Sequence, residues 1–419
     1  MHEPAQIFAS IFSAWRRILV AVLLVLGMFP ANPALAQEAE FQQFLASFEQ
    51  KALAAGISSS VYRQAIADVH FDPAIGGRIS GQPEFTTPIW EYLDQRVNSG
   101  RISRGRAAFD ANKALFLRVG QQYGVDPYIL AAIWGIETDY GAVLNNSGLI
   151  KPIVPSLANL VFAERGRVAQ DEAEFISALA LLQRSGLSSS QLVGSWAGAI
   201  GHLQVNPGVI LRFGTDGDGD GKVDLHRSLA DALATSAQLL RSFGYLPGTD
   251  WGFEVEVPSG VDLLLATREE MRPVSFFAER GVKRVAGRQF SDPDEPVFLY
   301  LPAGLNGPKF LMTKNYLVLK DYNFSDSYAL SVAHLTDRLK GAGQFVQPWP
   351  RQTQFPNRSQ RVAIQQWLKD LGFYSGEVDG RIGPISQRAY QFFQSRIGVP
   401  ADGFITLESY NLLQRAVGQ

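Results

Sequence analysis

The sequence predicts a mainly α-helical (α+β) fold with a small β-containing part and a small three-helix domain at the C-terminus. Residues 38–245 carry apolar side chains mostly at the three- and four-residue spacings of amphipathic helices. Residues 251–320 contain short alternating stretches bounded by Pro, Gly and Asn, as strands are. Helical spacing then returns and continues to the end of the chain. A length of 419 residues is enough for two or three domains.

Glycine marks the ends of the first predicted helices. Helical spacing over residues 41–56 stops at Gly56, and helical spacing over residues 106–124 stops at Gly124. In the β-containing part, the strand-like stretches are residues 252–260, 296–302 and 315–323. Residues 327–341 are predicted to be helical again.

The last part of the chain is predicted to be a separate small domain. Residues 344–357 are rich in Pro and Gln with little periodicity, which is typical of a linker. Residues 358–419 contain two Asp-Gly turns, at Asp379 and Asp402, each followed by an isoleucine and a helical segment. An amphipathic helix precedes them. This domain has no histidine cluster and no acid pair, which favours binding over catalysis.

The composition excludes several classes of protein. The formal net charge is −2, so no basic excess indicates a nucleic-acid partner. There is no cysteine, which excludes disulfides, thiolate nucleophiles, Cys-ligated zinc and a lipoprotein anchor.

The N-terminus has the order of a secretory signal peptide. Arg16 and Arg17 precede the apolar run ILVAVLLVLGMF, and Ala34 and Ala36 then form a cleavage-site pattern. A membrane helix is the alternative, but twelve residues are too few to span about 30 Å of hydrocarbon. We therefore predict that residues 1–36 are removed on export and that no membrane anchor remains.

One carboxylate stands at the end of an apolar helix. Asp126 and Pro127 are typical of an N-cap and a first helical residue, and Gly141 can end the helix. Glu137 lies in the last turn, next to the apolar face. Desolvation and the negative end of the helix dipole both favour the protonated carboxyl, which is what a general acid requires. The alternative is a solvated surface glutamate.

A glycine-rich block, residues 194–208, is the second candidate for the site. Small residues surround Ser195 and Gln204 and allow a backbone to approach a ligand closely. Hydroxyl and amide side chains can bind the hydroxyl and acetamido groups of a sugar. Such a block alone is also compatible with an ordinary loop.

Six blocks in order resemble one known family. They are QPEFTTPIWEYL, YGVDPYILAAIWGIETDYG, SWAGAIGHLQVNP, DGDGDGKVDLHRSLADAL, PAGLNGPKFLMTKNY and YNFSDSYALSVAHLTDRL. Residues 40–342 resemble the membrane-bound lytic murein transglycosylase B family, which has a lysozyme-like fold. The stretch from Trp367 to Gly403 resembles the common peptidoglycan-binding module. The resemblance implies a signal peptide at 1–36, a catalytic domain at 37–343, a linker at 344–357 and a peptidoglycan-binding domain at 358–419.

The resemblance also implies an activity. The family cleaves the MurNAc-GlcNAc β-1,4 bond of peptidoglycan without water and leaves a 1,6-anhydroMurNAc end. The glutamate of its E-T-x-[FWY]-G motif matches Glu137, which would act first as acid and then as base. No cofactor is expected for this catalysis. The expected substrate contacts are Ser195, Gln204, Tyr322, Asn323, Tyr328, Tyr92 and Arg167.

Two departures and two alternatives stay open at this stage. The family often has an aromatic and a methionine where this chain has residues 205–210, and its adjacent arginine pair is split here by Gly166. No second carboxylate is evident: Asp139 should point elsewhere, and the acidic run of Asp171, Glu172 and Glu174 reads as a solvated face. A hydrolytic muramidase is the first alternative, and a non-catalytic peptidoglycan-binding protein is the second.

The stretch DGDGDGKVD resembles the front of a calcium loop. Alternate aspartates supply oxygens, and Gly221 makes the sharp turn. The family takes its last carboxylate later in the chain. The expected ligands of a structural Ca²⁺ are Asp216, Asp218, Asp220, the carbonyl of Lys222 and Asp231. An acidic turn without an ion is the alternative.

The expected location is the periplasm, and the expected partners are peptidoglycan glycan strands. Cell-wall synthesis or division proteins are further candidate partners, and no nucleic acid is expected.

Overall fold

The computed structural model describes residues 33–78, 87–164 and 167–418. The predicted signal peptide therefore lies almost entirely outside the described residues. Of the helices in the described ranges, none is both long and apolar enough to cross a membrane.

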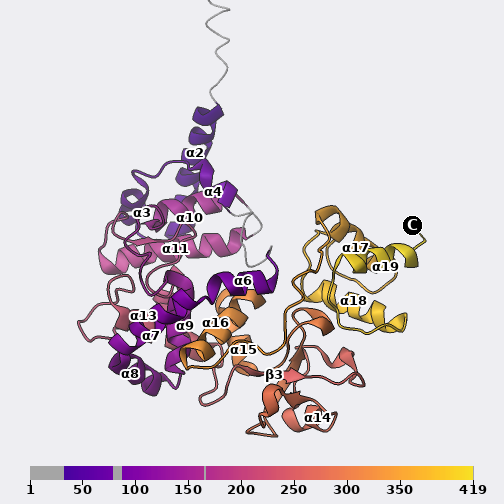
Figure 1. Ribbon diagram of the computed structural model, residues 1–419. Helices are drawn as coiled ribbons and strands as arrows, with labels where there is room; N and C mark the ends of the chain where they lie inside the picture. The colour runs from indigo at the N-terminus through magenta and orange to yellow at the C-terminus, as the bar shows by residue number, and fades with distance from the viewer. Residues whose placement is uncertain (1–32, 79–86, 165–166, 419) are drawn as a thin grey trace, which may run out of the picture.

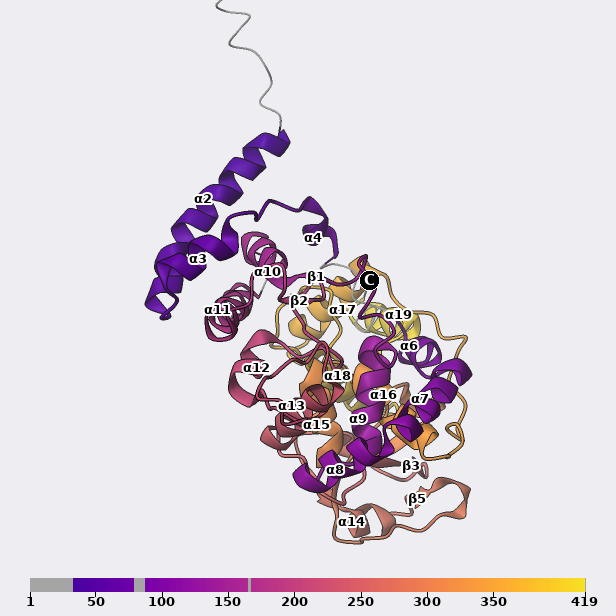
Figure 2. The same cartoon turned by 90° about the vertical axis from the view of Figure 1, so that its left-hand side faces the viewer.

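Most of the chain forms one helical body around a single large core (Figure 1). Its helices are α2 (Pro33–Ala54), α3 (Ser59–Ile66), α4 (Pro73–Arg78), α6 (Ile89–Arg96), α7 (Ser99–Ala111), α8 (Lys113–Tyr123), α9 (Pro127–Thr138), α10 (Ile153–Phe162), α11 (Val168–Ser185), α12 (Pro207–Phe213), α13 (Leu229–Ser242), α15 (Lys314–Asn323) and α16 (Asp326–Leu339). The N-terminal end of α2 projects away from this body (Figure 2). The mainly helical fold class is thus confirmed.

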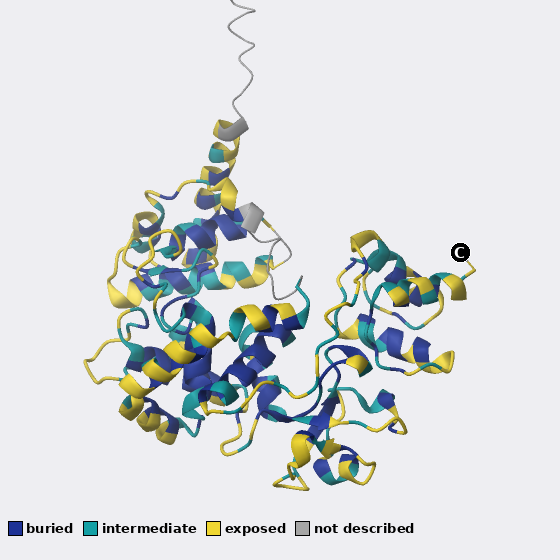
Figure 3. Cartoon of the chain, viewed as in Figure 1, coloured by how far each residue is buried: buried dark blue, intermediate teal, exposed yellow. Residues whose placement is uncertain are grey.

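Helix α9 lies in the centre of the body and packs against α16 (Figure 3). Asp126 caps α9 by accepting a hydrogen bond from the backbone N–H of Tyr128, and Pro127 is the first helical residue. Two contacts show that α9 and α16 run antiparallel. Lys340, just after α16, pairs with Asp126 at 2.5 Å. At the other end, the Tyr328 hydroxyl donates to Glu137 at 2.7 Å.

The end predicted for one helix was wrong, and so was the continuity predicted for another. Helix α9 ends at Thr138 rather than at Gly141, because Asp139 and Tyr140 adopt left-handed backbone conformations with φ of 51° and 61°. Aspartate tolerates this conformation better than most residues. The predicted helix over residues 106–124 is two helices, α7 and α8, separated at Asn112 with φ of −116° and ψ of 19°.

The β-containing part is a five-stranded antiparallel sheet with the order β4-β6-β7-β3-β5. The strands are β3 (Gly252–Glu256), β4 (Arg272–Pro273), β5 (Lys283–Arg284), β6 (Pro296–Tyr300) and β7 (Lys309–Met312), with α14 (Val274–Ala278) beside them. Short strands β1 (Lys151–Pro152) and β2 (Val193–Gly194) pair separately in the helical body. The sheet has its own core, which includes Val255, Val297 and Leu311.

The strand predicted at residues 315–323 is wrong, because this stretch is helix α15. Thr313 caps the helix by accepting a hydrogen bond from the backbone N–H of Asn315. Tyr316 and Leu319 are fully buried three residues apart, on one helical face. The alternation in the sequence was too short to separate the two possibilities.

Three C-terminal helices form a third core, as predicted. They are α17 (Arg358–Asp370), α18 (Pro384–Arg396) and α19 (Leu407–Ala416). Helices α17 and α19 each begin with a capping box, formed by Asn357 with Gln360 and by Thr406 with Ser409. The unit lies beside the sheet (Figure 1), where Gln391 donates to the Leu263 carbonyl at 2.6 Å.

The segment between α16 and α17 runs along the sheet and the helical body. Residues 344–357 contain no helix or strand. Gln347 donates its backbone N–H to Glu254 at 2.7 Å, and Arg351 pairs with Asp94 at 2.6 Å. The predicted linker is therefore anchored along its length, while the predicted domain boundaries themselves stay predictions.

The glycine Gly135 in α9 leaves room for the ring of Tyr140, since a Cβ atom there would lie 2.6 Å from Tyr140 Cζ. We expect Gly135→Ala to destabilise the protein by about 1–3 kcal/mol through overpacking, which exceeds the gain of about 1 kcal/mol in helix propensity. Chemical denaturation measures this change in the free energy of unfolding.

Gly100→Ala is the matched control, because a Cβ at Gly100 meets only the flexible side chains of Arg104 and Asn98 at 3.2 and 3.3 Å. It should leave the stability equal or slightly raised. Equal stabilities of the two variants would contradict the packing of Tyr140 against α9.

Candidate active site

Glu137 reaches the surface of the helical body at the end of α9. Its side chain is half-buried, and its Oε1 accepts a hydrogen bond of 2.7 Å from the hydroxyl of Tyr328. Tyr328 lies in the first turn of α16 and is 2% exposed. The catalytic acid predicted from the sequence is thus held by one of the predicted substrate contacts.

Tyr322 lies parallel to Tyr328, with ring centroids 6.3 Å apart and planes 4° apart. Its hydroxyl donates to the Leu203 carbonyl at 2.8 Å and lies 3.2 Å from the Ser236 hydroxyl. Burial raises the pKa of both tyrosines well above the ordinary value, and the charge of Glu137 adds to this. Both phenols therefore stay protonated and act as hydrogen-bond donors at neutral pH.

The glycine-rich block folds back against the end of α9. Thr138 donates its hydroxyl to the His202 carbonyl at 2.7 Å. Ile200 pairs with Val205 in a tight turn, in which Gln204 has a φ of 49° and donates to the Gly201 carbonyl at 2.9 Å. Two residues of this turn are thus bound from outside it, His202 by Thr138 of α9 and Leu203 by Tyr322. Gln204 follows them directly in the sequence.

Ser195 lies in a separate turn that precedes this one and is closed on Ala199. Its backbone N–H donates to the Ala199 carbonyl at 2.8 Å, and its hydroxyl accepts from the Ala199 N–H at 3.1 Å. A hollow of about 630 Å³ opens beside the turn and is lined by residues that include Gly141, Val193 and His202. The turn after α9, through Gly141, and the glycine-rich block, through His202, therefore border one open space.

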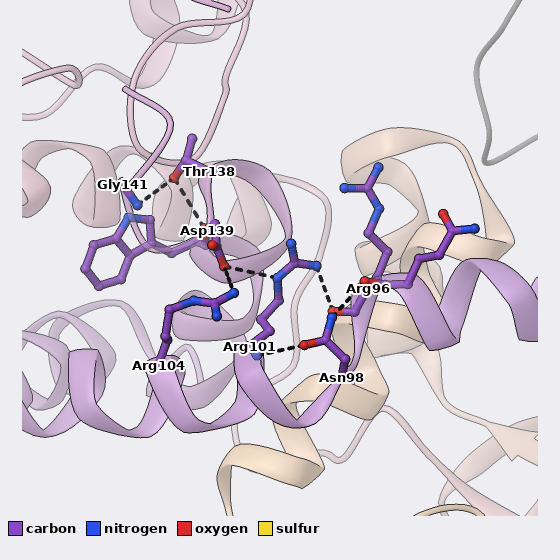
Figure 4. Close-up of polar contacts among 9 residues, drawn as sticks. Arg96, Asn98, Arg101, Arg104, Thr138, Asp139 and Gly141 are labelled. Atoms are coloured by element: carbon purple, nitrogen blue, oxygen red, sulfur yellow. Dashed lines mark hydrogen bonds and ion pairs between the residues drawn. The ribbon is translucent and has the colours of Figure 1, made fainter. Parts of the chain in front are cut away.

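Asp139, two residues after Glu137, forms ion pairs with two arginines (Figure 4). Asp139 Oδ1 accepts from Arg104 Nη2 at 2.9 Å and from Arg101 Nε at 3.3 Å. Burial raises the pKa of Asp139, but the two arginines hold it below its usual value. Asp139 is therefore a structural group, ionised at neutral pH, that ties the end of α9 to α7.

The other predicted contacts have different surroundings. Tyr92, on α6, is 3% exposed, and the Arg96 guanidinium lies over its ring at 5.1 Å. Asn323 is half-buried and ends α15, one residue after Tyr322. Arg167 precedes α11, has a side chain 56% exposed and pairs with Asp171 at 3.4 Å.

The acidic run of α11 is less solvated than predicted, since the side chains of Asp171 and Glu172 are 14% and 24% exposed. Glu174 departs from the prediction as well. Glu174 is half-buried and accepts the Gly208 N–H at 2.8 Å, so it fixes the start of α12 behind the glycine-rich block. Burial raises its pKa despite this hydrogen bond. The helix that carries Glu174 packs against α12, and this long-range contact has no signal in the local sequence.

His202 supports the site although it was not among the predicted substrate contacts. Its Nδ1 accepts from the indole N–H of Trp134 at 3.0 Å. Burial, with the neighbouring His226, lowers the pKa of His202 to about 4. It is therefore a neutral hydrogen-bond acceptor that ties the turn to α9.

The aspartate-rich loop brings three carboxylates together. Oxygens of Asp216, Asp218 and Asp231 lie within 4.8 Å of one another. Asp231 is 1% exposed and accepts the N–H groups of Gly217 and Asp224 at 2.8 and 2.7 Å. This set of hard oxygen ligands fits Ca²⁺. Of the predicted ligands, Asp220 and Lys222 lie outside this group, and the Asp220 carboxylate accepts the Lys222 N–H at 2.8 Å.

The sequence matches known protein families over most of its length. Residues 40–337 match the family described as transglycosylase SLT domain, and residues 357–413 match a peptidoglycan binding domain. The membrane-bound lytic murein transglycosylase B of Escherichia coli is 24% identical over 251 residues. That match covers 58% of this chain and 65% of the relative, so it spans less than two thirds of that protein.

Solved structures give a closer match. SltB3 from Pseudomonas aeruginosa, in complex with NAG-anhNAM-pentapeptide, is 37% identical with a TM-score of 0.82, over 89% of this chain and 99% of that one. The Escherichia coli lytic transglycosylase Slt35, in complex with calcium, is 20% identical with a TM-score of 0.59, over 72% and 93% of the two chains. The second likeness shows the fold alone. The family match covers most of the sequence and includes both Glu137 and the glycine-rich block, so the chain belongs to the transglycosylase SLT domain family of lytic transglycosylases.

Proposed function

We propose that the chain cleaves the MurNAc-GlcNAc β-1,4 bond of peptidoglycan and leaves a 1,6-anhydroMurNAc end, with Glu137 as the single acid and base. The observation that carries the proposal is the half-buried Glu137 held by Tyr328, while Asp139 beside it is neutralised by two arginines. The complex of the P. aeruginosa relative with an anhydro-sugar peptide supports the same chemistry.

The proposed reaction needs no water. The protonated Glu137 donates its proton to the glycosidic oxygen, and the bond between C1 and that oxygen breaks. The N-acetyl group of MurNAc assists at C1. The Glu137 carboxylate then accepts the proton of the C6 hydroxyl as that oxygen forms a bond to C1, which returns Glu137 to its starting state. Retaining glycosidases normally use a second carboxylate about 5–5.5 Å away, and substrate-assisted enzymes are the exception.

Substitution of the acid tests this chemistry. Glu137→Gln is expected to lower turnover by at least about 10²-fold, since an amide neither donates nor accepts the proton. Mass spectrometry of fragments released from purified sacculi measures both rate and product. The intact chain should give anhydro ends, each one water lighter than a reducing end.

Two results would contradict the proposal. Reducing ends from the intact chain would make it a hydrolase, and full activity of Glu137→Gln would remove Glu137 from the chemistry. Asp139→Asn is the matched control: it should lower stability because it leaves two arginines without their partner, yet it should not change the product.

We also propose that Asp216, Asp218 and Asp231 hold a structural Ca²⁺, with Asp220 and the Lys222 carbonyl as further ligands. Three carboxylates this close repel one another without a cation. The calcium complex of Slt35 supports the same choice of ion. The loop joins α12 to α13, which carries Ser236 beside Tyr322, so the ion would stiffen the support of the site.

Metal removal tests this site. EDTA is expected to lower the melting temperature by several degrees and excess Ca²⁺ to restore it, because an ion bound only to the folded chain stabilises it by about 2.7 kcal/mol at 100 times its Kd. Asp218→Asn should melt at one temperature with EDTA or with Ca²⁺. An intact chain whose melting ignores both reagents has no calcium site.

The C-terminal helices are proposed to bind the cell wall after export of the chain to the periplasm, with residues 358–419 as the binding domain and 344–357 as its linker. Glycan strands are the proposed ligand, and cell-wall synthesis or division proteins are further proposed partners. Deletion of residues 358–419 from the Glu137→Gln chain is expected to reduce co-sedimentation with sacculi several-fold. Equal co-sedimentation of both chains would place all binding in the catalytic part.

A further inference from the structure

A half-buried charge cluster lies at the first turn of α16, which also carries Tyr328. Asp326, two residues earlier in the first turn of α16, receives hydrogen bonds from three side chains. Arg268 Nη1 lies 3.2 Å and 3.3 Å from its two oxygens and Arg268 Nη2 lies 3.3 Å from Oδ2, Lys320 Nζ lies 2.9 Å from Oδ2, and the Tyr316 hydroxyl lies 3.1 Å from Oδ1.

The cluster is shielded from solvent. The side chains of Asp326 and Arg268 are each 23% exposed, and Tyr316 is fully buried. The Arg268 guanidinium also lies over the ring of Tyr300 at 5.6 Å. Burial raises the pKa of Asp326, but Arg268 and Lys320 hold it below its usual value. In this cluster the Arg268 guanidinium binds the Asp326 carboxylate through both of its terminal nitrogens, which fixes the ionic contact.

Arg268 comes from a part of the chain distant from the catalytic motifs. It lies between the short helix η2 (Leu263–Leu265) and β4, in the β-containing part. This segment is itself held from the other side, because Gln391 and Arg388 of α18 donate to the carbonyls of Leu263 and Leu264 at 2.6 and 2.9 Å. Asp326 therefore connects the start of α16 to a segment anchored on two sides.

We propose that Arg268 is a positioning residue of the active site, which fixes the first turn of α16 through Asp326 and so keeps the Tyr328 hydroxyl on Glu137. The proposal rests on the proposed function of Glu137 as the acid and base. Tyr328 follows Asp326 by two residues, so a rotation or shift of this turn moves both side chains together. A small displacement of a catalytic group is enough to cost a large factor in rate.

The test compares four single variants of the full-length chain. Arg268→Met removes the charge, Arg268→Lys keeps it with a single donor group, and Tyr328→Phe removes the hydroxyl that acts on Glu137. Arg280→Met is the matched control, since Arg280 lies in the same β-containing part and its guanidinium contacts the carbonyl and the ring of the neighbouring Phe276, on the surface of the sheet unit. Release of anhydro ends from a soluble glycan strand is measured as kcat and KM, well below the melting temperature of each variant.

We expect Arg268→Met to lower kcat about 10- to 100-fold with KM changed less than about twofold, because binding surfaces are kept while the acid is misplaced. Arg268→Lys should recover most of the loss, and Arg280→Met should behave as the intact chain. In the Tyr328→Phe background, Arg268→Met should cost less than about twofold, since the two residues act on one step.

Two outcomes overturn the proposal: a kcat of Arg268→Met within twofold of the intact chain, or full multiplication of the two losses in the double variant. If Arg268→Met does not fold, Arg268→Gln, which also removes the charge but keeps a polar side chain, decides by the same rule with and without Tyr328→Phe. The product of the intact chain is measured in every series. Reducing ends there would refute the proposed function itself, while the comparison of variants still reports on Arg268.

Discussion

The antiparallel packing of α9 against α16 is the contact on which the site depends. Lys340 and Asp126 close one end of the pair at 2.5 Å, and Tyr328 and Glu137 close the other at 2.7 Å. Between these ends both helices are buried almost throughout, which fixes their register. The contact between Tyr328 and Glu137 is therefore a property of two packed helices rather than of a loop, and rigid elements hold side chains more accurately than loops do.

The carboxylates around the site differ in the charge of the side chains that donate hydrogen bonds to them. Asp139 and Asp326 face guanidinium groups, which hold both as carboxylates. The hydroxyl that donates to Glu137 belongs instead to Tyr328, a phenol whose pKa is raised well above its ordinary value. A cationic partner would favour the ionised carboxylate and oppose proton donation, whereas a neutral donor allows both protonation states that the proposed reaction uses.

Much of the site could be predicted because its signals are local or matched a family motif. Asp126, Pro127 and the apolar spacing after them are local signals, and they placed Glu137 at the end of a helix. The glycine-rich block indicated a backbone that a ligand could approach closely, but the tight turn in it, with Gln204 in the left-handed region, was not predicted. The left-handed turn after Thr138 was not predictable from Gly141 alone, since it depends on two arginines of α7 that bind Asp139 across 35 and 38 residues of sequence.

What escaped the sequence is long-range. Residues 315–323 alternate like a strand over a few positions, but they form a helix because Thr313 caps them and their face fits against α16 and α13. Glu174 was predicted to be solvated because its partner, the Gly208 N–H, is 34 residues away.

Arg268 carried no signal at all, since an isolated arginine in an irregular segment is normally a surface residue. The same reasoning explains why its role follows from the structure. An arginine has no local reason to be buried, so its place between Asp326 and Tyr300 reflects what it holds in position. The element that it holds is the turn of α16 that carries Tyr328.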